Sequence, residues 1–282
     1  MPILSRLGMV FAQKWIAGVS ISDAIRKARE INGNGEKVIM NYLGEDLTDR
    51  RKIDSEIMCY KELLDSMRRN RIKGAISVKP TQLGLFLQEK LFAESLDGIA
   101  AYASKRKIFV WLDMEDYEFV EKTIDIYSRL LQKRKNVGIC IQSRLRRSYD
   151  DVKRLAGAGA RIRLVKGAYK YTDDISYMYD SEVDANYMRC AGYLFKNSDG
   201  FMIATHDSHL IEECRRLERR YKKRAQFAML KGIRGMLAKE LADGGEEVYI
   251  YMPFGEEWFR YSIRRLSEEG HALLLLRSVF QG

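Results

Sequence analysis

The chain has 282 residues, 46% of them hydrophobic, which is enough to bury one large core or two smaller ones. Its net charge of +10 raises binding to nucleic acid or to an anionic membrane as possibilities. No stretch approaches the ~18 consecutive apolar residues of a membrane-spanning helix. The four cysteines form no CxxC pair and follow no export signal. We therefore expect a cytoplasmic protein that is soluble or bound to the inner face of a membrane.

Eight short apolar runs alternate with longer amphipathic segments. Each run is too short for a helix but suits a buried strand, and the spacing leaves room for one helix between consecutive strands. The sequence therefore predicts an α/β fold, a (β/α)8 barrel of the TIM type, although an open doubly wound sheet would give a similar pattern. The predicted strands are 38–43, 75–79, 108–113, 137–142, 161–165, 201–205, 225–230 and 248–252.

The segments between these strands predict helices. Apolar stripes mark residues 49–67, 81–102 and 115–131 as amphipathic helices. Glycines at 157, 159, 244 and 245 fall where a helix must end and turn into the next strand. A further helix over 20–30 precedes the first strand, and we expect it to close the bottom of the barrel or to cover a flank. The prediction is one domain, 1–282, with residues 1–36 as an N-terminal helical extension.

Basic residues cluster at 68–73, 105–107, 133–135 and 215–224, each time at the end of a predicted helix. Cations there complement the negative end of the helix dipole, which is a structural reason for their position. In a barrel these helix ends gather on one face. Contact of this basic face with acidic lipid headgroups is therefore the alternative interpretation.

Polar residues follow six of the predicted strands at or just beyond their carboxyl ends. Enzymes of this fold assemble their active sites there, from the loops that follow the strands. The pattern predicts an active site on this rim, and the residues that mark it are Lys79, Asp113, Gln142, Lys166, Thr205, His206 and Tyr251.

Two other signals are weak. The glycine pairs at 33 and 35 and at 157 and 159 do not follow a strand and open a helix, so we interpret them as turns and not as dinucleotide loops. The three histidines form no HExxH motif and no cluster with cysteine, so no metal is expected.

The segment 161–171, RIRLVKGAYKY, places Arg163 and Lys166 around a strand that is otherwise buried. A charge inside a barrel is costly without a partner. An ion pair with Asp113 is one explanation. An anionic or electron-rich ligand such as a reduced flavin is the other.

The segment 251–268, YMPFGEEWFRYSIRRLSE, runs from the last strand into a helix that carries Arg264 and Arg265. Adjacent arginines on a helix usually lie on solvated surface. Here a Pro-Phe-Gly turn precedes the helix and would bring it back over the rim. Two guanidinium groups there would form a fork for a substrate carboxylate.

These segments together resemble the proline dehydrogenase family over most of the chain. The most specific elements are RLVKGAY at 163–169 and the YMPFG segment with its later arginine pair. Supporting elements in family order are LGE at 43–45, SVKPTQLGL at 77–85, WLDME at 111–115, Gln142 with the nearby RLRRS, and ATHD at 204–207.

The resemblance implies FAD held non-covalently inside a distorted barrel and oxidation of L-proline to 1-pyrroline-5-carboxylate, with electrons passing to a quinone or another acceptor. It implies that Asp113 and Arg163 are catalytic, Asp113 by orienting the cationic groups and Arg163 by lying nearest the flavin N5. The substrate would be held by Lys79, Tyr251, Arg264 and Arg265.

The resemblance also assigns the flavin site and a lid. Glu45 would pair with Arg264 when the last helix closes over the substrate. The residues around FAD would be Met114, Gln142, Arg163, Lys166, Gly167, Ala168, Thr205, His206 and Glu268. Asp207, Lys170, Tyr171 and Lys231 depart from the common family pattern, which bears on how tightly the cofactor is held.

Two other functions remain open from the sequence. One is a different flavin barrel enzyme, such as a methylenetetrahydrofolate reductase-like protein, which would not need an arginine fork. The other is a basic binding module in which the barrel is only a scaffold for a polyanion. We expect no nucleic-acid partner. The electron acceptor, the oligomeric state and the preference between proline and hydroxyproline are not determined by the sequence.

Overall fold

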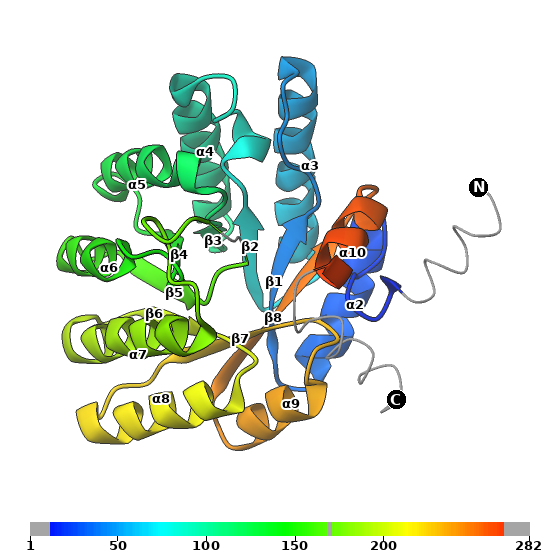
Figure 1. The fold of residues 1–282 in the computed structure, drawn as a ribbon. Coiled ribbons are helices and arrows are strands. Elements are labelled where there is room, and N and C mark those ends of the chain that lie inside the picture. The colour runs from blue at the N-terminus through cyan, green and yellow to red at the C-terminus, as the bar shows by residue number, and fades with distance from the viewer. Residues whose placement is uncertain (1–11, 169–170, 268–282) are drawn as a thin grey trace.

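The computed structural model contains a closed barrel of eight parallel strands, each followed by a helix (Figure 1). It describes residues 12–168 and 171–267, without the side chains of 264–267. Strands pair in sequence order, and β1 closes the barrel against β8. The predicted (β/α)8 barrel is confirmed. The strands are β1 (Lys37–Tyr42), β2 (Gly74–Val78), β3 (Phe109–Leu112), β4 (Val137–Gln142), β5 (Arg161–Val165), β6 (Phe201–Ala204), β7 (Gln226–Leu230) and β8 (Glu247–Phe254).

Four of the described helices begin where a short polar side chain accepts hydrogen bonds from free backbone N–H groups. Asp49, Asp116 and Asp207 cap α3, α5 and α8 in this way, and Ser20 with Asp23 forms a capping box at α2. The helices are α2 (Ile21–Gly33), α3 (Arg50–Arg69), α4 (Glu89–Ser104), α5 (Tyr117–Leu131), α6 (Ser148–Gly157), α7 (Asp180–Asn197), α8 (Ser208–Tyr221), α9 (Gly235–Asp243) and α10 (Trp258–Ser267), with a short 3-10 helix η1 (Thr81–Leu83).

The helix predicted over 81–102 is wrong at its start. The chain forms η1, turns at Gly84, and begins α4 only at Glu89. Gly84 has φ of +102°, in the left-handed region, and an added Cβ would lie 2.7 Å from the Leu91 side chain. The early part of this segment is therefore a loop at the carboxyl end of β2, which is where side chains of an active site are presented.

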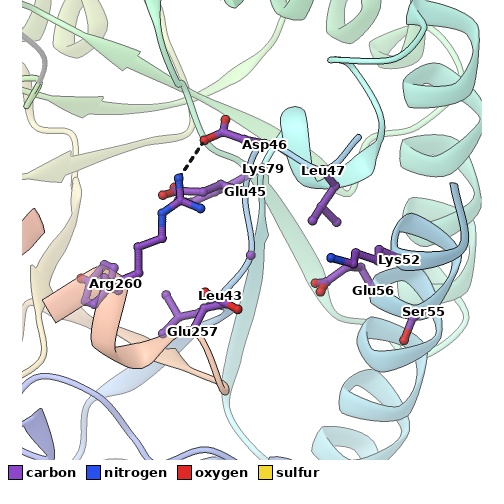
Figure 2. A pocket seen from close by; sticks show the side chains of 12 residues that line it. Leu43, Glu45, Asp46, Leu47, Lys52, Ser55, Glu56, Lys79, Glu257 and Arg260 are labelled. Carbon is purple, nitrogen blue, oxygen red and sulfur yellow. Dashed lines mark hydrogen bonds and ion pairs between the residues drawn. The ribbon is translucent and has the colours of Figure 1, made fainter. Parts of the chain in front are cut away.

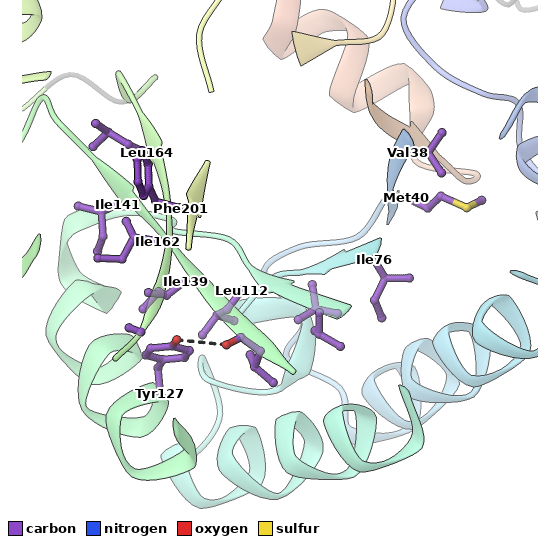
Figure 3. Close-up of a cluster of buried hydrophobic side chains, with 14 of the residues drawn as sticks. Val38, Met40, Ile76, Leu112, Tyr127, Ile139, Ile141, Ile162, Leu164 and Phe201 are labelled. Atoms are coloured by element: carbon purple, nitrogen blue, oxygen red, sulfur yellow. Dashed lines mark hydrogen bonds between the residues drawn. The ribbon is translucent and has the colours of Figure 1, made fainter. Parts of the chain in front are cut away.

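The core consists of two layers because strand side chains alternate between the barrel interior and the helices. Figure 3 shows part of the outer layer, where Ile139, Ile141 and Ile162 pack towards the helices and the Tyr127 hydroxyl donates to the Val137 carbonyl at 3.2 Å. The inner layer is lined by Ile39, Ala75, Trp111, Met202, Ala228 and Tyr249. Gly138 makes room for it, since an added Cβ would lie 2.5 Å from the Trp111 ring.

Helix α2 packs against β1, β8 and α3. Of the two positions expected for it, the flank is the one found. A regular barrel has the helix after the last strand on this outer side. In this chain, α10 instead reaches the loop after β1, where Arg260 lies 3.5 Å from Asp46. An N-terminal helix on the flank thus leaves the last helix at the carboxyl rim.

The amino ends of the strands form a face that we call the basic end. Four connections there, 68–73, 105–108, 132–136 and 219–225, contain no aspartate or glutamate. Helices α3, α4, α5 and α8 end within or just before the four predicted basic clusters, and β2, β3, β4 and β7 follow, so the clusters do lie between helix ends and strands. The exposed cations are Arg68, Arg69, Arg71, Lys73, Lys105, Lys107, Lys133, Lys135, Arg219, Arg220, Lys222 and Arg224.

Cys59, Cys140, Cys190 and Cys214 are free thiols in this structure. Among the described helices, none combines the length and the apolar character needed to cross a bilayer.

Candidate active site

A buried ion pair lies inside the barrel at the carboxyl end of its strands. Arg163 on β5 contacts Asp113, which directly follows β3, and their side chains are only 4% and 13% exposed. Burial alone would lower the pKa of Arg163, but the Asp113 carboxylate, together with Cys140 and Tyr251, raises that pKa. The ion pair that the sequence offered as one explanation for Arg163 is therefore present. For Lys166 the partners are different.

The Asp113 carboxylate also accepts two neutral hydrogen bonds. The Ser77 hydroxyl on β2 donates to Oδ1 at 2.7 Å, and the Tyr251 hydroxyl on β8 donates to Oδ2 at 2.8 Å. Burial and the neighbouring Asp113 raise the pKa of Tyr251 well above its usual range, so its phenol stays protonated. Four strands thus contribute to one cluster of Ser77, Asp113, Arg163 and Tyr251, which we call the central cluster.

Arg163 is only partly satisfied by this cluster. Its Nη2 donates to Asp113 and, at 3.3 Å, to Ser77, whereas its buried Nη1 has no hydrogen-bond partner in the part of the chain that is described. The guanidinium carbon lies 5.4 Å from the Trp111 ring centre and 5.3 Å from that of Tyr251. A buried donor without an acceptor is costly. Nη1 therefore marks a position where a ligand acceptor fits.

The side chains beyond β1 and β2 form a second set of contacts. Lys79 donates to the Glu45 carboxylate at 2.7 Å, and both side chains are nearly buried. Glu115 accepts from the Thr81 backbone N–H and hydroxyl at 2.7 and 2.8 Å, and Thr81 in turn accepts from the Asp46 N–H. Burial raises the pKa of Glu115 to about 6. These bonds hold the Glu45 loop over the rim.

A pocket of about 350 Å³ opens beside this loop (Figure 2). Figure 2 shows Lys79 and Glu45 at one side and Arg260 of α10 reaching towards Asp46. The pocket connects the loop after β1, helix α3 and helix α10. Its lining residues are Leu43, Gly44, Glu45, Asp46, Leu47, Lys52, Ser55, Glu56, Lys79, Glu257, Arg260 and Tyr261.

Lys166 follows β5 and is held by two carboxylates. It lies 2.6 Å from Asp184 of α7 and 2.9 Å from Asp207 at the start of α8. Burial alone would lower the pKa of Lys166, but these two carboxylates raise it. Asp207, one of the positions expected to bear on cofactor binding, gives Lys166 one of these two partners.

The other residues predicted around FAD lie on the same rim. The Gln142 amide donates to the Glu115 carbonyl at 3.2 Å, and Gly167, with φ of +104°, packs against Gln142. His206 Nε2 accepts from the Leu230 N–H at 2.9 Å, and the Thr205 hydroxyl accepts from the Asp207 N–H. Met114 is half-buried and Ala168 exposed.

Part of the prediction falls outside what the structure describes. Arg264 and Arg265 belong to α10, but their side chains lie outside the described residues, and so does the whole of Glu268. The proposed Glu45–Arg264 pair therefore stays a prediction, and the partner found for Glu45 is Lys79. Lys170 also lies outside the described residues. Within the described ranges, no group of histidine, cysteine and carboxylate side chains could hold a metal ion.

The sequence did not single out Ser77 or Glu115 for roles. Ser77 opens the SVKPT segment, and alternation with Lys79 would have placed both on the inner face. Glu115 directly follows the Asp113–Met114 pair. The sequence pattern could therefore have placed both residues near the site. Their hydrogen bonds, however, are made with residues on or just after other strands that are far away in the sequence.

A barrel with a buried charged cluster at the carboxyl ends of its strands has the arrangement of (β/α)8-barrel enzymes. The same fold is found in proline utilization A (PutA) from Bdellovibrio bacteriovorus inactivated by N-propargylglycine, at 26% identity and a TM-score of 0.86 over 92% of this chain. PutA from Corynebacterium freiburgense, at 24% identity and a TM-score of 0.79, supports the fold alone. This chain spans 33% of each of those proteins.

The chain belongs to the proline dehydrogenase family, whose profile matches residues 24–277. Proline dehydrogenase 2 of Bacillus subtilis (strain 168) is 31% identical over 92% of this chain and 86% of its own length. Proline dehydrogenase of Deinococcus radiodurans is 31% identical over 91% of this chain and 86% of its own length. Proline dehydrogenase 1 of Bacillus subtilis subsp. natto is 29% identical over 98% of this chain and 92% of its own length.

Proposed function

We propose that this chain is an FAD-dependent proline dehydrogenase that oxidises L-proline to 1-pyrroline-5-carboxylate. Membership of the family supports proline as the substrate. The observation that carries the proposal is the buried Arg163, whose Nη1 has no hydrogen-bond partner among the described residues while its Nη2 is held by Asp113 and Ser77. A flavin ring carries the acceptor atoms and the developing negative charge that such a donor favours.

Bound FAD would supply the chemistry by accepting the hydride from the proline carbon next to nitrogen. The chain's residues would hold it: Arg163 through its open Nη1, and Lys166, whose charge is already fixed by Asp184 and Asp207. The remaining residues proposed for this site are Met114, Gln142, Gly167, Ala168, Thr205, His206 and Glu268.

The proline carboxylate would be bound by cations at the rim. Lys79 suits the binding of a carboxylate because its nearly buried ammonium needs an anionic partner. Glu45 is that partner in this structure. A bound carboxylate would share Lys79 with Glu45 or replace it. Arg264 and Arg265 would complete the carboxylate site, with Glu45 then available to Arg264. Tyr251, kept neutral and fixed by Asp113, would pack beside the ring.

The proline amine must lose its extra proton before the adjacent C–H bond can release hydride. Fixing the carboxylate and the ring sets the distance and angle between the reacting atoms, which accounts for much of the rate gain in such reactions. Closure of α10 over the rim would exclude water from this contact.

The test is the visible absorbance of the purified protein before and after L-proline is added without oxygen. We expect a yellow protein, or one that becomes yellow with FAD, whose flavin band bleaches with L-proline and not with D-proline. A protein that binds no FAD contradicts the cofactor. A yellow protein that L-proline does not bleach contradicts the substrate.

Arg265→Ala distinguishes this function from that of another flavin barrel enzyme such as a methylenetetrahydrofolate reductase-like protein. If the arginine fork binds the proline carboxylate, the variant should keep its FAD but need far more proline for bleaching. Bleaching at an unchanged proline concentration would contradict the carboxylate role. Glu240→Ala, at an exposed position on α9, is the control.

We further propose a quinone as the electron acceptor.

We also propose that the basic end makes a peripheral contact with anionic lipid. Each exposed lysine or arginine near such a surface contributes ~1 kcal/mol of attraction. Sedimentation with vesicles containing phosphatidylserine should therefore be salt-sensitive, and it should weaken in a Lys105→Gln/Lys133→Gln variant. Equal sedimentation with neutral vesicles would contradict a charge-driven contact.

A further inference from the structure

Residues 12–18, which we call the strap, lie beside α10, as Figure 1 shows for the blue segment before α2 and the orange last helix. The strap is tied to the carboxyl end of β8 by backbone bonds. Ala17 donates to the Pro253 carbonyl at 2.8 Å, and Gly255 donates to the Gly18 carbonyl at 3.1 Å. The start of the described chain is thereby attached to the rim of the site.

The loop after β7 is also shaped around the strap. The ammonium of buried Lys231 donates to the carbonyls of Gln13 and, at 2.9 Å, Lys14. Gly232 has φ of +79°, and a Cβ there would lie 2.1 Å from the Lys14 carbonyl oxygen. Burial lowers the pKa of Lys231 to about 8. Lys231 thus holds the strap through two of its backbone carbonyls.

Trp15 links the strap to α10. Its indole Nε1 donates to the Ser262 hydroxyl at 2.9 Å, and Ser262 donates to the Trp258 carbonyl at 2.7 Å. Both tryptophans are buried. They pack in a separate apolar cluster that joins the strap, α10, and the loops after β1 and β7, composed of Ala12, Trp15, Ile16, Leu43, Ile233 and Trp258.

The contacts of this cluster lie close to the residues proposed for the substrate. Leu43 stands two positions before Glu45, the partner of Lys79, and Ser262 stands two positions before Arg264 on the same helix. Residues two positions apart on one helix keep a fixed relative position, so a shift of Ser262 moves Arg264 with it. A shift of ~1 Å in a helix that positions a substrate is enough to cost a large factor in rate or affinity.

We propose that the strap is part of the substrate site: Trp15 and Ser262 are positioning residues that set the place of α10 and, through it, the affinity for the substrate carboxylate. The inference rests on the proposed function, because it needs Arg264 and Arg265 as carboxylate ligands. It assigns the strap no contact with substrate or flavin.

The test is anaerobic flavin reduction by L-proline at increasing concentration in the FAD-loaded full-length protein. Trp15→Phe keeps the apolar ring and removes the indole N–H. Loss of one such hydrogen bond should raise the half-saturating proline concentration about fivefold. The limiting reduction rate should change less than twofold. Ser262→Ala should have the same effect, and the double variant should add little to either single change.

A second readout uses cyclopentanecarboxylate, which has the ring and carboxylate of proline but no amine to oxidise. Its dissociation constant, followed by the change in flavin absorbance, should also rise about fivefold, while the dissociation constant of FAD stays the same. Lys231→Met, with exposed Lys239→Met as its control, should act in the same direction by releasing the strap.

Tyr127→Phe is the matched control for Trp15→Phe. It also removes one buried hydrogen bond, to the Val137 carbonyl, but lies on the outer layer of the barrel. It should lower the melting temperature without changing either affinity. If Trp15→Phe and Ser262→Ala do the same, the strap is only structural and the inference is overturned. If L-proline does not reduce the wild-type flavin, the proposed function fails first and the inference falls with it.

Discussion

The two ends of the barrel both carry many charges, but they use them differently. At the carboxyl end, Asp113, Arg163, Lys79 and Glu45 are buried or nearly so, and each has a defined partner. At the basic end the cations are exposed, and in the ion pairs that some of them make, such as Arg219–Glu212 and Arg224–Glu246, the arginine side chain stays 60% or more exposed. Charge in the first region acts through individual buried contacts, and charge in the second acts mainly as a summed field that salt screens. Substitutions should therefore have large, specific effects at one end and small, salt-dependent effects at the other.

The largest effect is expected from Asp113→Asn, which leaves Arg163 buried without a counter-charge. Breaking one partner of a buried pair costs ~3–5 kcal/mol in the free energy of unfolding. Asp97→Asn is the control, since its pair with Arg134 is similarly close at 2.7 Å but a third or more exposed. It should cost less than ~1 kcal/mol in urea unfolding. Equal losses for the two variants would remove the proposed difference between buried and exposed charge.

Ser77→Ala should cause the next largest loss in the free energy of unfolding. It removes a 2.7 Å hydrogen bond to the Asp113 carboxylate, and bonds to charged groups contribute ~1.5–3 kcal/mol to stability. Ser128→Ala is the comparison, because that hydroxyl donates at the same distance to a helix carbonyl, away from the central cluster. Urea unfolding of both variants measures the difference. A larger loss at Ser128 would count against the central cluster as a stabilising unit.

Glu115→Gln tests the buried charges of the carboxyl end through the pH dependence of the free energy of unfolding. The folded pKa of Glu115 is about 6, above its ordinary value of 4.5, because of burial. The unfolded chain therefore releases this proton first as pH rises. Stability from the protonated group is complete below pH ~4.5 and is lost as pH rises through about 6, a change of ~2 kcal/mol. The wild type should lose this amount relative to Glu115→Gln between pH 4.5 and 7. Parallel stability curves for the two proteins would contradict it.

The smallest effect belongs to the basic end. Lys105→Gln combined with Lys133→Gln should change the free energy of unfolding by no more than ~0.5 kcal/mol, because both side chains are exposed. Any gain from reduced repulsion should appear at low ionic strength and vanish in 0.5 M salt. A loss above ~2 kcal/mol that salt does not alter would show that these lysines make specific contacts.

The strands were predictable because each buried run reads as continuously apolar and ends in a turn. The start of α4 was not, because the segment from Thr81 has a helical pattern and only the packing of Gly84 against Leu91 turns it into a loop. The charged pair Asp113–Arg163 could be anticipated, since a buried arginine demands a partner. Ser77 could not be, because serine on an inner face is common and its role depends on a neighbouring strand. The Trp15–Ser262 bond joins residues 247 positions apart, which no local pattern reveals.

The closing of the barrel has a consequence for how the chain is made. β1 pairs with β8 from Lys37–Tyr249 to Tyr42–Phe254, and the strap binds the same late segment. During synthesis the first seven strands therefore emerge as an open sheet whose β1 edge has no neighbour until β8 leaves the ribosome. An unpaired edge can pair with other chains, and contacts between distant residues form slowly. The chain should thus be most prone to aggregation just before β8 emerges, and a truncated product ending before Glu247 should not fold to a soluble barrel.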